Sequence, residues 1–345
     1  MGRRELARNY VAEIDISPRD RQRQGCFHRR PTGPGRRRQF MQKSFNFTLR
    51  PVLVSVLTAA MVWFGAVPAV EASDFITRAV TAYQQGNYDL AIAEFSESIQ
   101  LGVREAYYGR AKAFYQKGDY NRAIADLDNV IQLQNDSSAA ALELRGLAYF
   151  KKADYKSAAA DFGRVIDLRP GDPQLFLERG DAWFYFGKAG LAFADYNRSI
   201  QLNTTNATVY AHRGELYAAY KHDYRKGIVD CLTGISLDPG SWLAYNNLAA
   251  MLSMSPYAKI RDGQLAVIHA TKACELTHWK NPLPLSVLAA ADAENHDFAD
   301  AIKWQQASMD MDLDMGPDGT RLALNAEKKL ELYQNHRPFH ASTHN

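Results

Sequence analysis

The chain has 345 residues, of which 41 are Lys or Arg and 38 are Asp or Glu, and its formal net charge at neutral pH is +3. The positive excess lies in residues 1–72, which hold 13 basic and 5 acidic side chains, so the remaining 28 basic and 33 acidic residues give the rest of the chain a net charge of −5. A mildly acidic body has no electrostatic footprint for nucleic acid, and we expect no nucleic-acid partner.

The first 72 residues have the composition of a leader and an export signal. Residues 1–40 are rich in Arg, Gln, Gly and Pro and hold no core to fold around, which predicts a disordered extension. Residues 41–72 resemble a signal peptide, because basic residues follow Met41 and uncharged, mostly apolar residues fill positions 51–70. Met41 is therefore an alternative start to Met1. The small residues before Ser73 indicate a cleavage site.

The apolar run 51–70 leaves other interpretations open. About 20 apolar residues can just span a bilayer, so the run can instead be an uncleaved anchor. A buried helix of a cytosolic protein is a third interpretation. In both membrane-directed cases the Arg excess keeps the preceding residues in the cytoplasm. We expect an exported, periplasmic protein that is either soluble or tethered to the inner membrane.

A short pattern then recurs along the chain: a helix, a tight turn, and a second helix. The turns are Gly86-Asn87-Tyr88, Gly118-Asp119-Tyr120, Ala153-Asp154-Tyr155, Gly187-Lys188-Ala189, His222-Asp223-Tyr224 and His296-Asp297-Phe298. The first five turns follow one another at steps of 32, 35, 34 and 35 residues. A period near 34 is typical of helix pairs that stack into a solenoid.

The pattern predicts about seven helix pairs between residues 73 and 315. Five regular pairs are expected at Asp74–Gln85 with Tyr88–Leu101, Ala106–Lys117 with Tyr120–Leu133, Ala139–Lys152 with Tyr155–Leu168, Pro173–Phe186 with Ala189–Leu202, and Ala207–Lys221 with Tyr224–Leu237. The sixth pair, Trp242–Leu252 and a helix from Asp262 to Leu276, has a long connection, and the seventh is Leu285–Asn295 with Phe298–Met311. Residues 316–345 are expected to form a capping helix, Thr320–Gln334, and a frayed tail from 335.

Several positions recur together and carry a family resemblance. They are Leu142, Gly146, Tyr149, Tyr155, Ala158, Phe162 and Pro170 in one repeat, with Phe176, Gly180, Trp183, Ala192 and Tyr196, and Tyr210, Gly214 and Tyr217, in the next two. On these residues the chain resembles tetratricopeptide repeat proteins, and its last repeats resemble exported bacterial members of unassigned role. The resemblance implies an all-α, right-handed α-solenoid with a capping helix. It also implies a scaffold, not an enzyme, that binds a protein or peptide in a concave groove.

One charged pattern goes beyond this outline. Arginines recur at one first-helix position and aspartates at one second-helix position, namely Arg110, Arg145, Arg179 and Arg213 with Asp126, Asp161, Asp195 and Asp230, and Glu94 takes the acidic place in the first repeat. Folding each pair about its turn brings the two positions level, so we predict structural ion pairs within a repeat or to the preceding one. The alternative is an exposed arginine row that binds acids.

A second pattern is aromatic. Tyr83, Tyr115, Phe150 and Phe184 share a late first-helix position, which in the family lines the groove. The partner-binding groove is therefore expected to contain Tyr108, Lys112, Tyr115, Glu143, Phe150, Asp181, Phe184 and Tyr185. The competing interpretation is that the rings fill the space between helices. Lys112 alone matches the family's peptide-carboxylate clamp, so capture of an acidic C-terminus is not expected.

Catalytic and metal signals are poor. The chain has no His-Glu-x-x-His spacing, Gly-x-Ser-x-Gly motif, phosphate loop or dinucleotide fingerprint, so we expect no catalytic site, no metal and no cofactor. Two rival functions remain: a membrane-anchored assembly factor, and a hydrolase subunit with a site in the 253–261 loop, where Asp262 is the one nearby acid. Cys231 and Cys274 fit buried thiols, and an oxidising compartment leaves a disulfide between them open.

Overall fold

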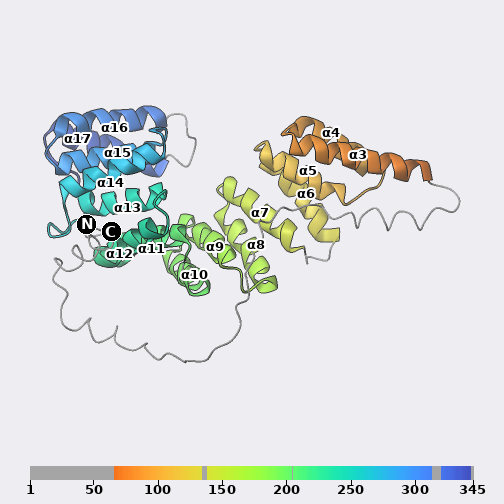
Figure 1. Cartoon of the computed structure of the whole chain (residues 1–345), viewed down its shortest axis with the longest axis horizontal. Coiled ribbons are helices and arrows are strands. Elements are labelled where there is room, and N and C mark those ends of the chain that lie inside the picture. The colour runs from red at the N-terminus through yellow and green to blue at the C-terminus, as the bar shows by residue number, and fades with distance from the viewer. Residues whose placement is uncertain (1–65, 134–137, 204, 313–319, 343–345) are drawn as a thin grey trace, which may run out of the picture. The chain divides into compact units, whose positions relative to one another are not determined.

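The computed structural model describes residues 66–133, 138–203, 205–312 and 320–342 (Figure 1). In these residues the chain forms fifteen α-helices and no strand, labelled α3 to α17. The predicted extension 1–40 and most of the predicted signal segment lie outside the described residues. No helix in the described part of the chain is both long enough and apolar enough to cross a bilayer.

The chain divides into two compact units, of which the first ends at Ala106. Its described part is one helical hairpin, α3 (Ala66–Gln84) and α4 (Tyr88–Gln100), packed through Ala79 and Ala91, both fully buried. Helix α3 begins before the predicted start at Asp74, so Ser73 lies inside a helix, because nothing from Val70 to Ser73 interrupts helical geometry.

The second unit, from Tyr107 onward, holds six further helix pairs and a last helix. They are α5 (Ala106–Gln116) and α6 (Tyr120–Leu133), α7 (Ala139–Lys151) and α8 (Tyr155–Leu168), α9 (Pro173–Tyr185) and α10 (Ala189–Leu202), α11 (Ala207–Lys221) and α12 (Tyr224–Leu237), α13 (Trp242–Met254) and α14 (Gly263–Leu276), α15 (Pro282–Glu294) and α16 (Phe298–Asp312), and α17 (Thr320–Gln334). From α6 to α17 each helix packs on the next in the chain. The fold is therefore an all-α solenoid of consecutive helix pairs.

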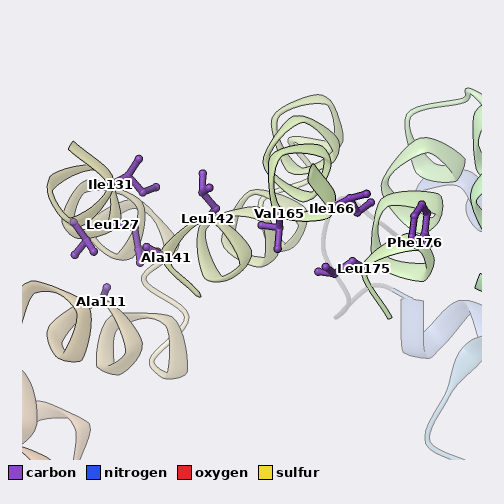
Figure 2. Close-up of a cluster of buried hydrophobic side chains, with 10 residues drawn as sticks. Ala111, Leu127, Ile131, Ala141, Leu142, Val165, Ile166, Leu175 and Phe176 are labelled. Carbon is purple, nitrogen blue, oxygen red and sulfur yellow. The ribbon is translucent and has the colours of Figure 1, made fainter. Parts of the chain in front are cut away.

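Within the second unit, the core runs on from one helix pair to the next. Figure 2 shows one cluster in which buried side chains from α5 to α9 meet, among them Ala111, Leu127, Leu142, Val165 and Leu175. In this unit, the helices of a pair bury apolar side chains partly against each other and partly against the next pair. This arrangement explains why the sequence needs a repeating pattern rather than one central set of apolar residues.

Small residues set the distance between the helices of a pair. A Cβ atom on Gly180 of α9 would lie 2.6 Å from the Tyr196 ring of α10, and one on Gly227 of α12 would lie 2.7 Å from the Gly214 carbonyl oxygen of α11. Real Cβ atoms do not come this close, so both positions require glycine unless the helices separate.

Each tight turn has one residue in left-handed backbone conformation. The residues with positive φ at the turns are Gly86, Gly118, Ala153, Gly187, His222 and His296. The residue after Ala153 and the one after His222 are Asp154 and Asp223, whose side chains accept hydrogen bonds from the first turn of the following helix. His222 and His296 therefore serve as turn residues.

The last helix, α17, has the predicted bounds, but the segment after it is docked rather than frayed up to residue 342. The Ala341 amide donates to the Met254 carbonyl over 2.8 Å, and His340 contacts Glu294. Tyr333 is fully buried and Leu330 is half-buried, whereas the side chain of Leu322 lies outside the described residues. The expectation of fraying was wrong because Phe339, an apolar residue in a polar segment, packs against the α15–α17 core.

Candidate protein-binding face

The predicted groove residues all belong to the first helices of three pairs, α5, α7 and α9. We call the surface that these helices share with α11 the first-helix face. The eight residues differ in solvent exposure. Some are exposed, some are half-buried, and one belongs to the core, so each has to be placed individually before the face can be assigned a chemistry.

Two of the predicted aromatic residues meet at the ends of α7 and α9. Tyr185 packs edge-on against Phe150, with ring centroids 5.6 Å apart, and stacks on Tyr155 at 5.3 Å. Tyr185 keeps 49% of its surface exposed, whereas Phe150 is half-buried. Tyr155 is the first residue of α8, and the sequence pattern predicted it as a turn and repeat residue but not as part of the groove. These three residues form the aromatic cluster.

Phe184 corrects the predicted site. It is only 8% exposed and belongs to the core that α9, α10 and α11 share, with Leu177, Tyr196 and Leu216. The interpretation that the rings fill interhelical space is right for this residue. Its neighbour Tyr185, one step around the helix, is the exposed one.

The remaining aromatic and basic residues on α5 are dispersed. Tyr115 is half-buried and packs edge-on against Tyr120, with centroids 5.4 Å apart. Tyr108 packs against the core cluster of Figure 2, and Lys112 is exposed. Burial, followed by the charges of Tyr120 and of Glu178 on α9, raises the pKa of Tyr115, so α5 lies within electrostatic reach of α9 on this face.

Carboxylates gather where α7 and α9 meet. Burial raises the pKa of Glu178 to about 7, and the negative charges of Glu143 and Asp181 add to the rise. Glu178 Oε1 accepts a hydrogen bond from Gln174, but its buried Oε2 has no partner. Glu143 itself pairs with Arg169. Glu178 was missed from the sequence, where a single glutamate on a helix gives no signal of its own.

Asp181 belongs to a polar group shared by three helices. It accepts a hydrogen bond from the Tyr196 hydroxyl of α10 over 2.8 Å, and its Oδ1 lies 3.7 Å from Nε2 of His212 on α11. The Tyr196 and His212 rings are stacked. Burial raises the pKa of Asp181 above its ordinary value. These contacts fix the position of the Asp181 carboxylate, and they leave only a small part of its side chain exposed to a partner.

The four arginines of the repeated charged pattern bind aspartates of their own repeats. Each forms two hydrogen bonds, one from Nε and one from Nη2, to the two carboxylate oxygens of Asp126, Asp161, Asp195 or Asp230. Arg145 also reaches Asp128 and Arg213 also reaches Asn197, each in the preceding repeat. In the first unit Arg78 binds Glu94. The four arginines of the pattern are therefore occupied by carboxylates of the same chain, and they do not form a free acid-binding surface.

The 253–261 loop is held by structural contacts. Arg261 donates to Glu294 and to the Ser255 carbonyl, and the Asp262 side chain accepts from the amide of Leu265 at the start of α14. Within the described part of the chain, no group of three or more His, Cys, Asp or Glu side chains forms a metal site.

The cysteines on α12 and α14 are free and buried. Cys231 and Cys274 form no disulfide. Burial raises the pKa of both thiols, that of Cys274 to about 12, so neither is a thiolate at neutral pH. Cys26 lies outside the described residues.

Solved structures with a similar arrangement come from helical repeat proteins. A tetratricopeptide repeat protein from Parabacteroides merdae superposes with a TM-score of 0.56 and 11% identity over 77% of this chain and 99% of its own. MamA from Desulfovibrio magneticus RS-1 gives a TM-score of 0.47 and 18% identity, over 50% of this chain and 97% of its own. YrrB, described as a tetratricopeptide repeat protein with an unusual peptide-binding site, gives 0.45 and 19%, over 49% and 88%.

No curated protein sequence matches the chain. The sequence profile of the tetratricopeptide repeat family matches it twice, at residues 76–140 and 143–207. Both matches fall on the regular helix pairs, with their left-handed turns and close glycine contacts. The chain is a tetratricopeptide repeat protein.

Proposed function

We propose that this protein is a non-enzymatic scaffold that binds a protein partner on the first-helix face, centred on the ends of α7 and α9. The observation that carries the proposal is the aromatic cluster, in which Tyr185 is about half exposed but already fixed by Phe150 and Tyr155. A large ring held in one position loses little conformational entropy on binding, and tyrosines of this kind often dominate interface energies.

The carboxylates beside the cluster suggest the partner's charge. Glu178 has a buried oxygen without a partner, and its neighbours Glu143 and Asp181 are acidic too. A partner Lys or Arg side chain near these three carboxylates would offset their mutual repulsion and favour the ionised form of Glu178. The preferred partner segment therefore has a basic residue close to an apolar one.

Affinity capture from an extract of the source organism tests this proposal. The full chain is compared with Tyr185→Ala and Glu178→Gln, and with Leu191→Ala as the matched control, because Leu191 on α10 is as exposed as Tyr185. We expect the two face variants to lose at least ten-fold in recovery of the partner and the control to lose none. Equal recovery by all four folded proteins would remove the first-helix face as the binding surface.

We also propose that the protein is exported, with residues 51–70 acting either as a cleaved signal or as an anchor. The support is the uncharged run after a basic segment. Sequencing the N-terminus of the protein purified from its host decides between the two forms. A start at Ser73 supports cleavage, a retained 51–70 segment in the membrane fraction supports the tether, and a full-length cytosolic chain contradicts export.

A further inference from the structure

The segment after α17 makes a set of contacts that no repeat pattern accounts for. Residues 337–342 have no helical structure, yet they contact the C-terminal ends of α13 and α15 at three successive positions, Phe339, His340 and Ala341. An extended peptide that fixes a ring, a charged side chain and a main-chain amide on helices is a recognised way for one protein to bind another.

The ring contact is apolar and has a well-defined lining. Phe339 packs against a core cluster that contains Ala290 and Ala293 of α15 and the fully buried Tyr333 of α17. The alanines leave room for a large ring on the surface of α15. The ammonium of Lys329, itself only 7% exposed, lies 5.5 Å from the centre of the Phe339 ring, a distance suited to a cation–π contact.

The charged contact is made by one shared carboxylate. Glu294, the last residue of α15, binds Arg261 through Oε1 at 2.8 Å and His340 through Oε2 at 2.6 Å. Arg261 in turn donates to the Ser255 carbonyl after α13. Glu294 is therefore fixed by the loop before it meets the segment, and its second oxygen faces a position suited to a basic side chain.

The main-chain contact completes a helix end. The last carbonyls of any helix lack partners within the helix. At the end of α13, the Leu252 carbonyl accepts from the Asp262 amide, and the Met254 carbonyl accepts from the Ala341 amide over 2.8 Å. Any extended peptide can supply the second bond, whatever its side chains, so it gives affinity while Phe339 and His340 give selectivity.

We propose that the ends of α13 and α15 form a peptide-binding site for an extended segment with an aromatic residue followed by a basic one, and that residues 337–342 are its built-in, displaceable occupant. The site shares no residue with the aromatic cluster at Tyr185, so it goes beyond the partner binding proposed there. An attached occupant acts at a high effective concentration, on the order of millimolar, and blocks the site against weaker external peptides.

The test uses a fluorescent peptide of residues 335–345 and the full chain. The peptide is titrated into wild-type protein and into a Phe339→Ala/His340→Ala variant, whose own segment no longer fills the site. We expect the variant to bind the peptide at least ten-fold more tightly than wild type. A peptide carrying Phe339→Ala should bind the variant at least ten-fold more weakly than the natural peptide.

Three results would overturn the proposal: no binding by the folded variant, equal binding by wild type and variant, or equal binding of the two peptides. Amide hydrogen exchange of the wild-type chain provides a second measurement if the variant fails to fold. A displaceable segment exchanges through local opening while α13 and α15 stay protected. Exchange of residues 337–342 only through global unfolding contradicts the proposal. The partner capture by the Tyr185 surface is unaffected by either outcome.

Discussion

Arg179 binds Asp195 through both carboxylate oxygens, with Nε 2.9 Å from Oδ2 and Nη2 2.7 Å from Oδ1. The two residues face each other across the α9–α10 pair because the turn between the helices brings positions 16 residues apart to the same level. The aspartate side chain is 7% exposed and the arginine side chain 25%. The carboxylate is therefore buried, while the guanidinium still reaches water.

Replacing Arg179 by Ala should destabilise the fold. The change leaves Asp195 as a buried carboxylate without its cation, which costs about 3–5 kcal/mol when a pair is fully buried. Because Arg179 is partly exposed, we expect about 1–3 kcal/mol. Chemical denaturation measures the loss. Arg78→Ala is the control, since Arg78 is 51% exposed in its pair with Glu94 and should lose less than about 1 kcal/mol. An equal loss of unfolding free energy in both variants would contradict the burial of the Asp195 carboxylate.

Replacing Gly227 by Ala should destabilise the α11–α12 pair. The new Cβ would lie 2.7 Å from the Gly214 carbonyl oxygen, which is backbone and cannot rotate away. Overpacking of this kind typically costs about 1–3 kcal/mol. Gly190→Ala is the matched control, because nothing lies within 4 Å of its Cβ, and it should gain about 0.5–1 kcal/mol from lower chain entropy. Thermal unfolding of both variants measures these changes. A Gly227→Ala protein as stable as wild type would rule out the close contact between α11 and α12.

Replacing Ala153 by Gly should stabilise the turn between α7 and α8. Ala153 has φ of 58°, a left-handed conformation that costs an L-residue with a Cβ about 1–2 kcal/mol. Glycine adopts it freely, so we expect a gain of about 0.5–1 kcal/mol after its larger unfolded-state entropy. Gly187→Ala, at the equivalent turn with φ of 81°, should show the opposite sign. Two changes of the same sign in denaturant midpoint would refute the turn geometry.

The structure follows the sequence pattern where contacts are local and repeated. The turn residues, the helix bounds of the regular pairs and the arginine–aspartate pairs all depend on spacing within about 35 residues, which a repeated sequence displays many times. Asp230 lies seventeen residues after Arg213, one more than in the other three pairs, and the predicted ion pair still forms. Such contacts need no knowledge of distant parts of the chain.

The face residues could not be placed with the same accuracy. Phe184 and Tyr185 are neighbours in a first helix, and only the packing of α9 with α10 and α11 decides that Phe184 is buried and Tyr185 exposed. The segment after α17 is a second case, because its contacts with Met254 and Glu294 join residues that lie far apart in the sequence. A single sequence carries no periodic signal for such contacts.

Replacing Lys329 by Met should change how stability depends on pH. Burial lowers the pKa of Lys329 from 10.5 to about 8, so the folded chain binds this proton less well than the unfolded chain. Lys329 therefore does not lower the free energy of unfolding above pH 10.5, where it is neutral in both states. That free energy falls as the pH drops from 10.5 to 8, because the unfolded chain takes up the proton first. At pH 7 the variant should be more stable than wild type by on the order of 3 kcal/mol. Its free energy of unfolding should also change less between pH 8 and 10.5.

Lys328→Met provides the control for this measurement, because Lys328 is exposed on the same helix. Urea denaturation at pH 7, 8, 9 and 10 compares the three proteins. The control should follow the wild-type profile at every pH. A Lys329→Met profile parallel to that of wild type would show that the lysine is solvated in solution.

The most direct measurement of the central claim is site-specific photo-crosslinking from the first-helix face. A photoreactive phenylalanine derivative is placed at position 185, and in a second protein at the equally exposed position 191 on α10. If the scaffold binds its partner through the aromatic cluster, position 185 gives a covalent adduct with that partner and position 191 gives none. A partner that crosslinks at 191 and not at 185, with the complex intact, contradicts the account.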